Sequence, residues 1–96
     1  MSINRFAKKR DRNEPEIIEA LEQIGCSIQR IDVPCDLIVS HPMIDNNLLI
    51  EVKMPGKQPT KIQKDMLDAW PGQYDIVYSA EEAVGFVSSK ISLVER

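Results

Sequence analysis

The sequence lacks the residues and runs that several common types of site, and membrane proteins, require. It holds two cysteines, Cys26 and Cys35, in no Cys-x-x-Cys arrangement, and one histidine, His41. These residues exclude a self-contained zinc site of the usual spacing and argue against a histidine-based hydrolytic mechanism. No apolar run approaches the ~18 residues that cross a membrane, and the first residues are charged where a secretory signal would be apolar. We therefore expect a cytoplasmic protein whose cysteines are reduced, half-buried packing residues.

Positive charge is also scarce, because 12 lysines and arginines face 15 aspartates and glutamates, for a net charge of −3. That balance argues against binding nucleic acid through bulk charge. The distribution is uneven: residues 1–12 carry a local charge of +4, and the rest of the chain carries −7. Four lysines in the acidic remainder follow one another without an intervening acid: Lys53, Lys57, Lys61 and Lys64. Localised positive stretches are typical of phosphate contact, although a basic N-terminal arm can equally be a plain solubilising segment.

The length of 96 residues, with 43% hydrophobic and 28% charged residues, suits one domain with one modest core. No repeat or low-complexity linker divides the chain. We expect a basic arm over residues 1–12 and a single domain over residues 13–96.

Capping and turn signals divide the domain into helices and strands. Helix starts are marked by three patterns: Asn13-x-x-Glu16, Thr60-x-x-Gln63 and Ser79-x-x-Glu82. The first helix runs to about Ile24, where Gly25 supplies a left-handed stop, and the second runs through Trp70. Strands are expected at 26–31, 36–40, 48–54 and 74–78, with 91–94 as a candidate final strand. The predicted order is α-β-β-β-α-β followed by a short helix, which is an α/β fold.

A carboxylate and an ammonium group stand together at the end of the third predicted strand. Side chains alternate between the two faces of a strand, so Glu51 and Lys53 share one face and the apolar residues beside them share the other. Charged groups at the end of a buried strand cost stability unless they are paired or bound to a metal. With Asp36 at the start of the preceding strand, the pattern suits metal-dependent phosphodiester hydrolysis. The alternative is an ordinary surface ion pair, which contributes about 0–1 kcal/mol.

The first helix adds a third carboxylate. Glu14 begins the apolar stripe of that helix, at i, i+3, i+4 and i+7 spacing with three residues: Ile17, Ile18 and Leu21. We therefore expect Glu14 to point toward the sheet, near Asp36 and Glu51, and Glu16 to face solvent or the cap. The alternative is that Glu14 only complements the positive end of the helix dipole.

Together these residues resemble a known family. The segments that carry the resemblance are Asn13-Glu14-Pro15-Glu16-Ile17-Ile18, Pro34-Cys35-Asp36-Leu37-Ile38-Val39, Leu49-Ile50-Glu51-Val52-Lys53 and Gln63. They look like the VRR-NUC (virus-type replication-repair nuclease) branch of the PD-(D/E)xK superfamily, in its small stand-alone form in phages and bacteria, over about residues 8–87. They are also similar to archaeal Holliday-junction resolvases. One departure is that Cys35 separates Pro34 from Asp36, whereas the family usually has its proline beside the aspartate.

The resemblance implies a restriction-endonuclease-like core, with a mixed sheet flanked by helices, in the cytoplasm of a bacterial or phage-infected cell. It also implies a metal-dependent DNA endonuclease that is selective for branched or four-way-junction DNA. Asp36 and Glu51 would bind the metal with the Val52 carbonyl, and Glu14 would complete the acidic cluster. Oxygen ligands of this kind favour Mg²⁺, or Mn²⁺ in its place.

Further roles follow from the same resemblance. Lys53 would position or activate the attacking water, and Gln63 would hold the site or the phosphate from the second helix. The third position of a capping box would use a glutamine in any case, so Gln63 has a structural alternative. DNA contacts are expected from the arm and from the lysines that follow the third strand: Lys8, Lys9, Arg10, Lys57, Lys61 and Lys64.

Trp70 follows Ile62 and Met66 at helical spacing, so we expect it in the core rather than as a base-stacking platform. Tyr74 and Tyr78 share one face of a strand and need only pack there.

A homodimer is expected, because each chain has one candidate site and a branched or double-stranded substrate needs two cuts. A core of this size also leaves C-terminal apolar residues that are hard to bury alone: Phe86, Val87, Ile91 and Leu93. Two rival classes stay open. One is a catalytically inactive nuclease-like fold that binds nucleic acid or a protein, and the other is a small acidic interaction protein, which the pI of about 5.1 favours.

Overall fold

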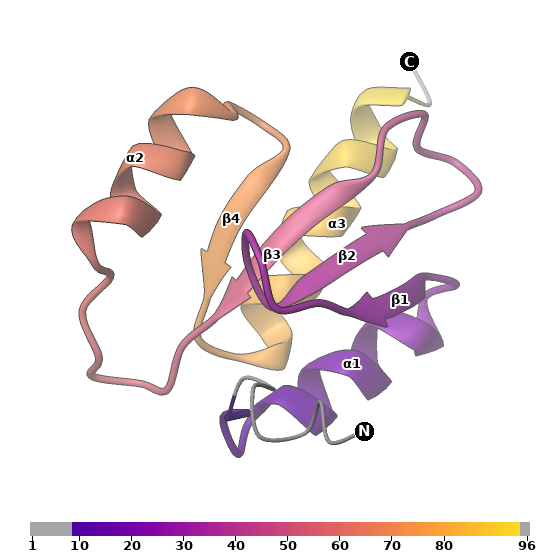
Figure 1. The fold of residues 1–96 in the computed structure, drawn as a ribbon. Helices are drawn as coiled ribbons and strands as arrows, with labels where there is room; N and C mark the ends of the chain where they lie inside the picture. Colours follow the sequence, from indigo (N-terminus) through magenta and orange to yellow (C-terminus); the bar gives the residue numbers. More distant parts are fainter. Residues whose placement is uncertain (1–8, 95–96) are drawn as a thin grey trace, which may run out of the picture.

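The computed structural model describes the backbone of residues 9–94 and the side chains of residues 9–91. Its seven elements are α1 (Glu14–Gln23), β1 (Ser27–Arg30), β2 (Leu37–Ser40), β3 (Leu48–Val52), α2 (Lys61–Ala69), β4 (Tyr74–Val77) and α3 (Ala80–Val94) (Figure 1). This order confirms the α/β prediction, with strands one or two residues shorter than expected. The last helix, expected to be short, is instead the longest of the three, with 15 residues. No helix within residues 9–94 is long and apolar enough to cross a membrane.

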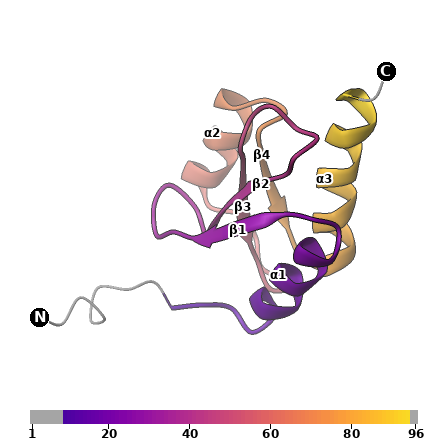
Figure 2. The same ribbon diagram turned by 90° about the vertical axis from the view of Figure 1, so that its right-hand side faces the viewer.

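The four strands form one mixed sheet in the order β1-β2-β3-β4. β1 pairs with β2 and β2 with β3 in antiparallel fashion, whereas β3 and β4 are parallel. Parallel neighbours need a crossover connection, and α2 lies in that crossover. The helix is thereby carried to the side of the sheet opposite α1 and α3 (Figure 2).

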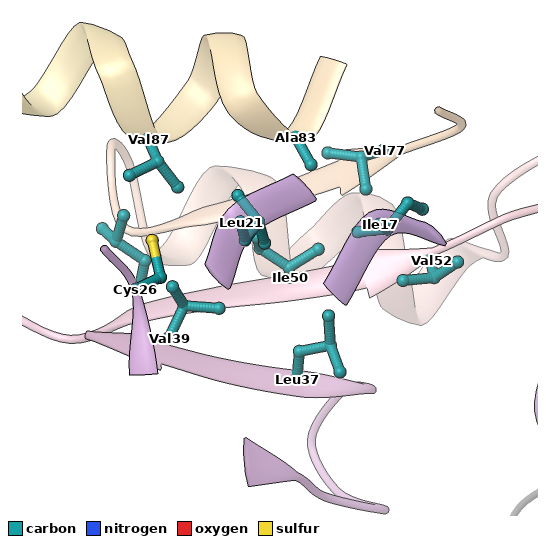
Figure 3. Packing of buried hydrophobic residues seen from close by; sticks show 11 residues of the cluster. Ile17, Leu21, Cys26, Leu37, Val39, Ile50, Val52, Val77, Ala83 and Val87 are labelled. Carbon is teal, nitrogen blue, oxygen red and sulfur yellow. The ribbon is translucent and has the colours of Figure 1, made fainter. Parts of the chain in front are cut away.

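The hydrophobic core lies between the sheet and the layer formed by α1 and α3. Figure 3 shows side chains from both helices meeting those of the strands in one cluster. Its buried members are Ile17, Leu21, Cys26, Leu37, Val39, Leu48, Ile50, Val52, Val77, Ala83 and Val87. Because β3 alternates, Ile50 and Val52 fill this core while Glu51 points to the α2 side of the sheet. The predicted face assignment on β3 is therefore confirmed.

Two of the three predicted caps form. Thr60 Oγ1 accepts from the backbone nitrogen of Gln63 at 3.2 Å, and Gln63 Oε1 accepts from that of Thr60 at 2.9 Å, which is a complete capping box. Ser79 Oγ accepts from the nitrogen of Glu82 at 3.1 Å. The Asn13 prediction is wrong: the residue stands at the N-cap position, but its side chain makes no capping bond.

Asn13 instead joins α1 to the ends of two strands. Its side-chain amide nitrogen donates to the carbonyl oxygens of Lys53, at 3.0 Å, and Tyr78, at 3.2 Å. The backbone of Asn13 is in the helical region, so the side chain is turned away from the first helical turn. These two long-range bonds replace the expected local one.

The candidate strand at residues 91–94 is wrong, because α3 continues to Val94. Ala83 and Val87 are buried, and Ile91 packs against the same cluster, so an i, i+4, i+8 stripe extends the helix along the core. The expected C-terminal apolar surface is wrong in part for the same reason. Val87 is fully buried and Phe86 packs against the core, while the Leu93 side chain lies outside the described residues.

Two further burial predictions are wrong. Cys26 and Cys35 are free thiols, but both are buried rather than half-buried. Trp70, expected in the core, is 45% exposed, and no residue of α2 is buried. The physical reason is the position of α2, which lies against the edge strand β4 with no further layer to cover its apolar side.

Candidate active site

Four of the five predicted catalytic residues line one open pocket at the carboxyl end of β3. They are Asp36, Glu51, Lys53 and Gln63, in a pocket of about 410 Å³. The remaining lining residues come from the segment before α1, the β1–β2 loop, the end of β3 and the start of α2: Lys9, Asp11, Pro34, Val52, Thr60 and Ile62. Asp36, which precedes Glu51 by fifteen residues in the chain, therefore lies in the same pocket as Glu51 and Lys53.

Backbone pairing sets the positions of the two pocket carboxylates. Asp36 precedes β2, and its Oδ2 accepts from the backbone nitrogen of Val52 at 2.8 Å. The nitrogen of Asp36 donates to the Ile50 carbonyl at 3.2 Å, so the residue is held to β3 twice. Glu51 lies between these two contacts on the same strand, with Ile76 of β4 as its neighbour in the sheet. The site is thus built into the sheet rather than carried on a mobile loop.

Both carboxylates are largely buried, with relative exposures of 5% for Asp36 and 7% for Glu51. The negative charge of these carboxylates affects the pKa of the buried Tyr74 hydroxyl. Burial, and next the negative charge of Glu51, raise the pKa of the Tyr74 hydroxyl, with a smaller contribution from Asp36. A cation near the two carboxylates would be stabilised by the same field.

Glu14 is buried, as predicted, but it does not line the pocket. Its Oε2 accepts from Arg30 Nε at 2.7 Å, and its Oε1 lies 3.6 Å from Arg10 Nη1. Glu16, in contrast, is exposed, as predicted. Among residues 9–91, no three histidine, cysteine, aspartate or glutamate side chains are grouped to hold a metal ion. The structure therefore brings Asp36 and Glu51 together and does not add Glu14 to them.

Arg10 lies close to both Glu14 and Asp36. Its guanidinium lies 3.4 Å from Asp36 Oδ1 and 3.2 Å from Asp32 Oδ1, besides its approach to Glu14. It also donates to the Ile31 carbonyl at 3.0 Å. This arginine, expected to contact DNA, is held by acceptors of its own chain. Because Arg10 precedes α1, helical spacing gives no signal for its contacts, which depend on the folded chain.

The donor set in the pocket fits a divalent cation that prefers oxygen. Asp36, Glu51 and the Val52 carbonyl supply hard oxygen ligands, and Mg²⁺ is commonly bound by one or two carboxylates while keeping several waters. Two carboxylates are enough for such a site, so the absence of Glu14 from the pocket lining is compatible with it.

Gln63 belongs both to the cap of α2 and to the pocket lining. Its side-chain oxygen completes the α2 capping box, and the residue also lines the pocket. Gln63 therefore has a structural role in the helix cap, and its side-chain amide nitrogen is the group that can donate to a ligand.

The other predicted cationic contacts differ in accessibility. Lys9 is exposed and lines the pocket, whereas Lys57 and Lys64 are exposed but do not line it. Lys61 is exposed and pairs with Asp65 at 3.0 Å. Lys8 lies outside the described residues.

Comparison of the chain with protein-family models, with curated proteins and with solved structures finds no match in any of the three.

Proposed function

We propose that the protein is a metal-dependent endodeoxyribonuclease of the PD-(D/E)xK type, similar to the VRR-NUC branch, with its active site in this pocket. The observation that supports the proposal most is the convergence of Asp36, Glu51, Lys53 and the Val52 carbonyl at the end of one strand. The element order and the pairing of the aspartate strand with the Glu-x-Lys strand agree with the core expected for such nucleases.

Each pocket residue has its own role in the proposed reaction. Asp36, Glu51 and the Val52 carbonyl would hold Mg²⁺, which supplies polarisation of the scissile phosphate and a lowered pKa for a bound water. Lys53 lies two residues beyond Glu51 on the same strand face, so its ammonium group can orient the attacking water or stabilise charge that develops on the phosphate. The Gln63 amide nitrogen can donate to a phosphate oxygen from the opposite wall. Lys9 adds positive charge at the rim.

The proposed substrate is DNA, in particular branched or four-way-junction DNA, and the proposed compartment is the cytoplasm. A homodimer stays part of the proposal on one ground only, the need for two cuts. The C-terminal surface that we expected to form it is largely taken up by the core of the chain.

One observation favours a second candidate, a nuclease-like fold that binds nucleic acid without cutting it. Arg10 places a guanidinium 3.4 Å from Asp36 Oδ1, and that charge neutralises the carboxylate in part without any metal. In an inactive protein this contact would be permanent. In an active one, the metal and Arg10 would share or exchange the carboxylate.

Incubation of the purified chain with plasmid, hairpin, flap and four-way-junction DNA, with Mg²⁺ or with EDTA, separates these candidates. The nuclease cleaves at least one substrate in Mg²⁺ and none in EDTA. The inactive binder retains the same DNA in a mobility-shift assay under both conditions and cuts nothing. A protein that neither cuts nor retains any of the four DNA substrates would contradict both proposals. That result would favour the third class, a small acidic interaction protein.

A further inference from the structure

Most of the exposed large apolar side chains belong to α2 and its C-cap. Among the described residues the full set is Val33, Met43, Ile62, Leu67 and Trp70, with exposures of 81%, 41%, 75%, 36% and 45%. Three belong to α2 or its C-cap, and Val33 belongs to the β1–β2 loop. Figure 2 shows this loop and α2 on the same side of the sheet, away from α1 and α3. Pro34, next to Val33, and Ile62 both line the pocket.

The apolar residues of α2 form a stripe that starts at the pocket. Ile62, Met66 and Trp70 recur every four residues and so lie along one side of the helix. A rise of about 1.5 Å per residue separates Ile62 from Trp70 by roughly 12 Å along the axis. The stripe thus begins in the pocket wall and ends with an indole ring at the far end of the helix.

Positive charge lies near the pocket end of this stripe. Lys9 and Lys53 line the pocket, and Lys57 and Lys61 are exposed before and at the start of α2, whereas Lys64 lies on the opposite side of the helix from Ile62 and Met66. Lys61 forms an ion pair with Asp65 at 3.0 Å, in which the two side chains are 87% and 61% exposed. Such a pair contributes little stability and can be exchanged for a phosphate. Lysines that follow an apolar and aromatic track are the combination by which proteins bind unpaired polynucleotide strands.

We propose that α2 is a track for an unpaired polynucleotide strand that leads into the pocket. A base stacks on Trp70, a second packs near Ile62, and phosphates at the pocket end meet Lys9, Lys57 and Lys61. The strand must be unpaired, because a duplex buries its base faces in its own stack. This inference rests on the proposed nucleic-acid function and specifies which part of the substrate reaches the helix.

A second copy of the chain is the competing occupant of the stripe, and the size of α2 disfavours it. The helix has 9 residues and is about 14 Å long. A stable protein interface buries roughly 800 Å² on each partner, which a pair of such helices does not provide alone. Stacking needs only one exposed ring for each base.

Trp70 is the only tryptophan of the chain, so its fluorescence reports directly on the track. The test is a titration of the full chain in EDTA with oligothymidylate and, separately, with a blunt mixed-sequence duplex. Oligothymidylate should quench the emission in a saturable, salt-dependent way, and the duplex should leave it unchanged. Loss of one stacked base costs about 1–3 kcal/mol, so Trp70→Ala should weaken binding of labelled oligothymidylate by roughly 5- to 150-fold in fluorescence anisotropy. Ile62→Ser removes an apolar contact but no ring, so it should weaken binding by a smaller factor.

Met43→Ala is the matched control, because Met43 is 41% exposed in the turn between β2 and β3 and does not line the pocket. Its affinity should equal that of the wild type within twofold. Unchanged wild-type emission at saturating oligothymidylate would overturn the proposal whether or not the variants fold. Emission that depends on protein concentration without DNA, together with a dimer in sedimentation, would overturn it in favour of a second copy.

Failure of this inference and failure of the proposed activity are distinguishable. Binding is measured without metal, so a chain that quenches with oligothymidylate and never cleaves DNA refutes the endonuclease alone. A chain that cleaves DNA in Mg²⁺ while Trp70 emission and the affinity of Trp70→Ala stay unchanged refutes the track alone.

Discussion

Asp36 Oδ2 accepts a hydrogen bond from the backbone nitrogen of Val52, 2.8 Å away, although the two residues are 16 positions apart in the chain. The bond joins the start of β2 to the segment that carries Glu51 and Lys53. It therefore gives Asp36 a structural task in addition to the proposed metal ligation.

This bond predicts different effects for two substitutions of Asp36. Asp36→Ala leaves a buried N–H of Val52 without its acceptor and should lower the free energy of unfolding by about 1–3 kcal/mol. Asp36→Asn keeps an acceptor oxygen and should cost less, while still removing the charge that a metal needs. Urea unfolding followed by circular dichroism measures both. Equal losses for Ala and Asn would show that the bond to Val52 adds nothing to stability.

Glu14 should prove to be mainly structural. Glu14→Gln removes the charged partner of Arg30 and Arg10, so we expect a stability loss of about 1–3 kcal/mol. Glu16→Gln, at an exposed position of the same helix turn, should cost at most about 1 kcal/mol. Arg30→Gln tests the pair from its other side. If the Glu14→Gln and Arg30→Gln losses simply add in the double variant, the ion pair does not stabilise the fold.

Asn13→Ala should destabilise the junction between α1 and the sheet. The change leaves the Lys53 and Tyr78 carbonyls without their donor, at an expected cost of about 1–3 kcal/mol. Because one of the two bonds holds the backbone of Lys53, DNA cleavage should fall as well. Asn46→Ala, at an exposed turn position, is the control. A fully stable Asn13→Ala would mean that these bonds are dispensable.

Asp75 should limit stability at neutral pH. Burial raises the pKa of its carboxyl and the charge of Glu82 adds to this, against the opposing effects of the Ile76 N–H and Lys90. A pKa raised by folding gives stability that is complete at acidic pH and declines as the pH rises through the folded-state pKa. Asp75→Asn stays neutral and can still accept from Ile76, so it should be more stable than the wild type at pH 7. The difference should vanish near pH 3, and a difference that grows toward acid would have the wrong sign.

Local patterns predicted what local forces determine. The Thr60–Gln63 capping box uses groups three residues apart, and the alternation of Glu51 with Ile50 and Val52 follows from strand geometry. Both were therefore visible in the sequence, as was the burial of Glu14 from its place on the apolar stripe.

The failures have a common physical cause, which is partners far away in the chain. Asn13 was expected to cap its own helix, but its acceptors are 40 and 65 residues away. Helical periodicity correctly put Trp70 on an apolar side of α2, yet periodicity does not say whether another layer covers that side. Arg10 was expected at DNA because it belongs to a basic segment, and the acidic groups that hold it come together only in the folded chain.

Lys53 should contribute to turnover more than to folding, since its side chain is only half-buried. Loss of one group that stabilises developing charge costs about 100- to 1,000-fold in rate. We expect Lys53→Ala to lose activity in that range in Mg²⁺ with its urea midpoint nearly unchanged. Lys57→Ala, an exposed lysine outside the pocket lining, should stay within tenfold of wild type. Matching losses for the two variants would assign Lys53 to bulk charge rather than to chemistry.

The most direct test of the account is the rate at which Glu51→Gln cleaves, in Mg²⁺, the DNA that the wild type cleaves best, with Glu16→Gln as the matched control. Glu51 is 7% exposed in the pocket, and Glu16 is exposed on α1. The account predicts that Glu51→Gln shows no cleavage above the EDTA background while its circular dichroism spectrum stays native, and that Glu16→Gln cleaves at the wild-type rate. Wild-type turnover by a folded Glu51→Gln would contradict the proposed site.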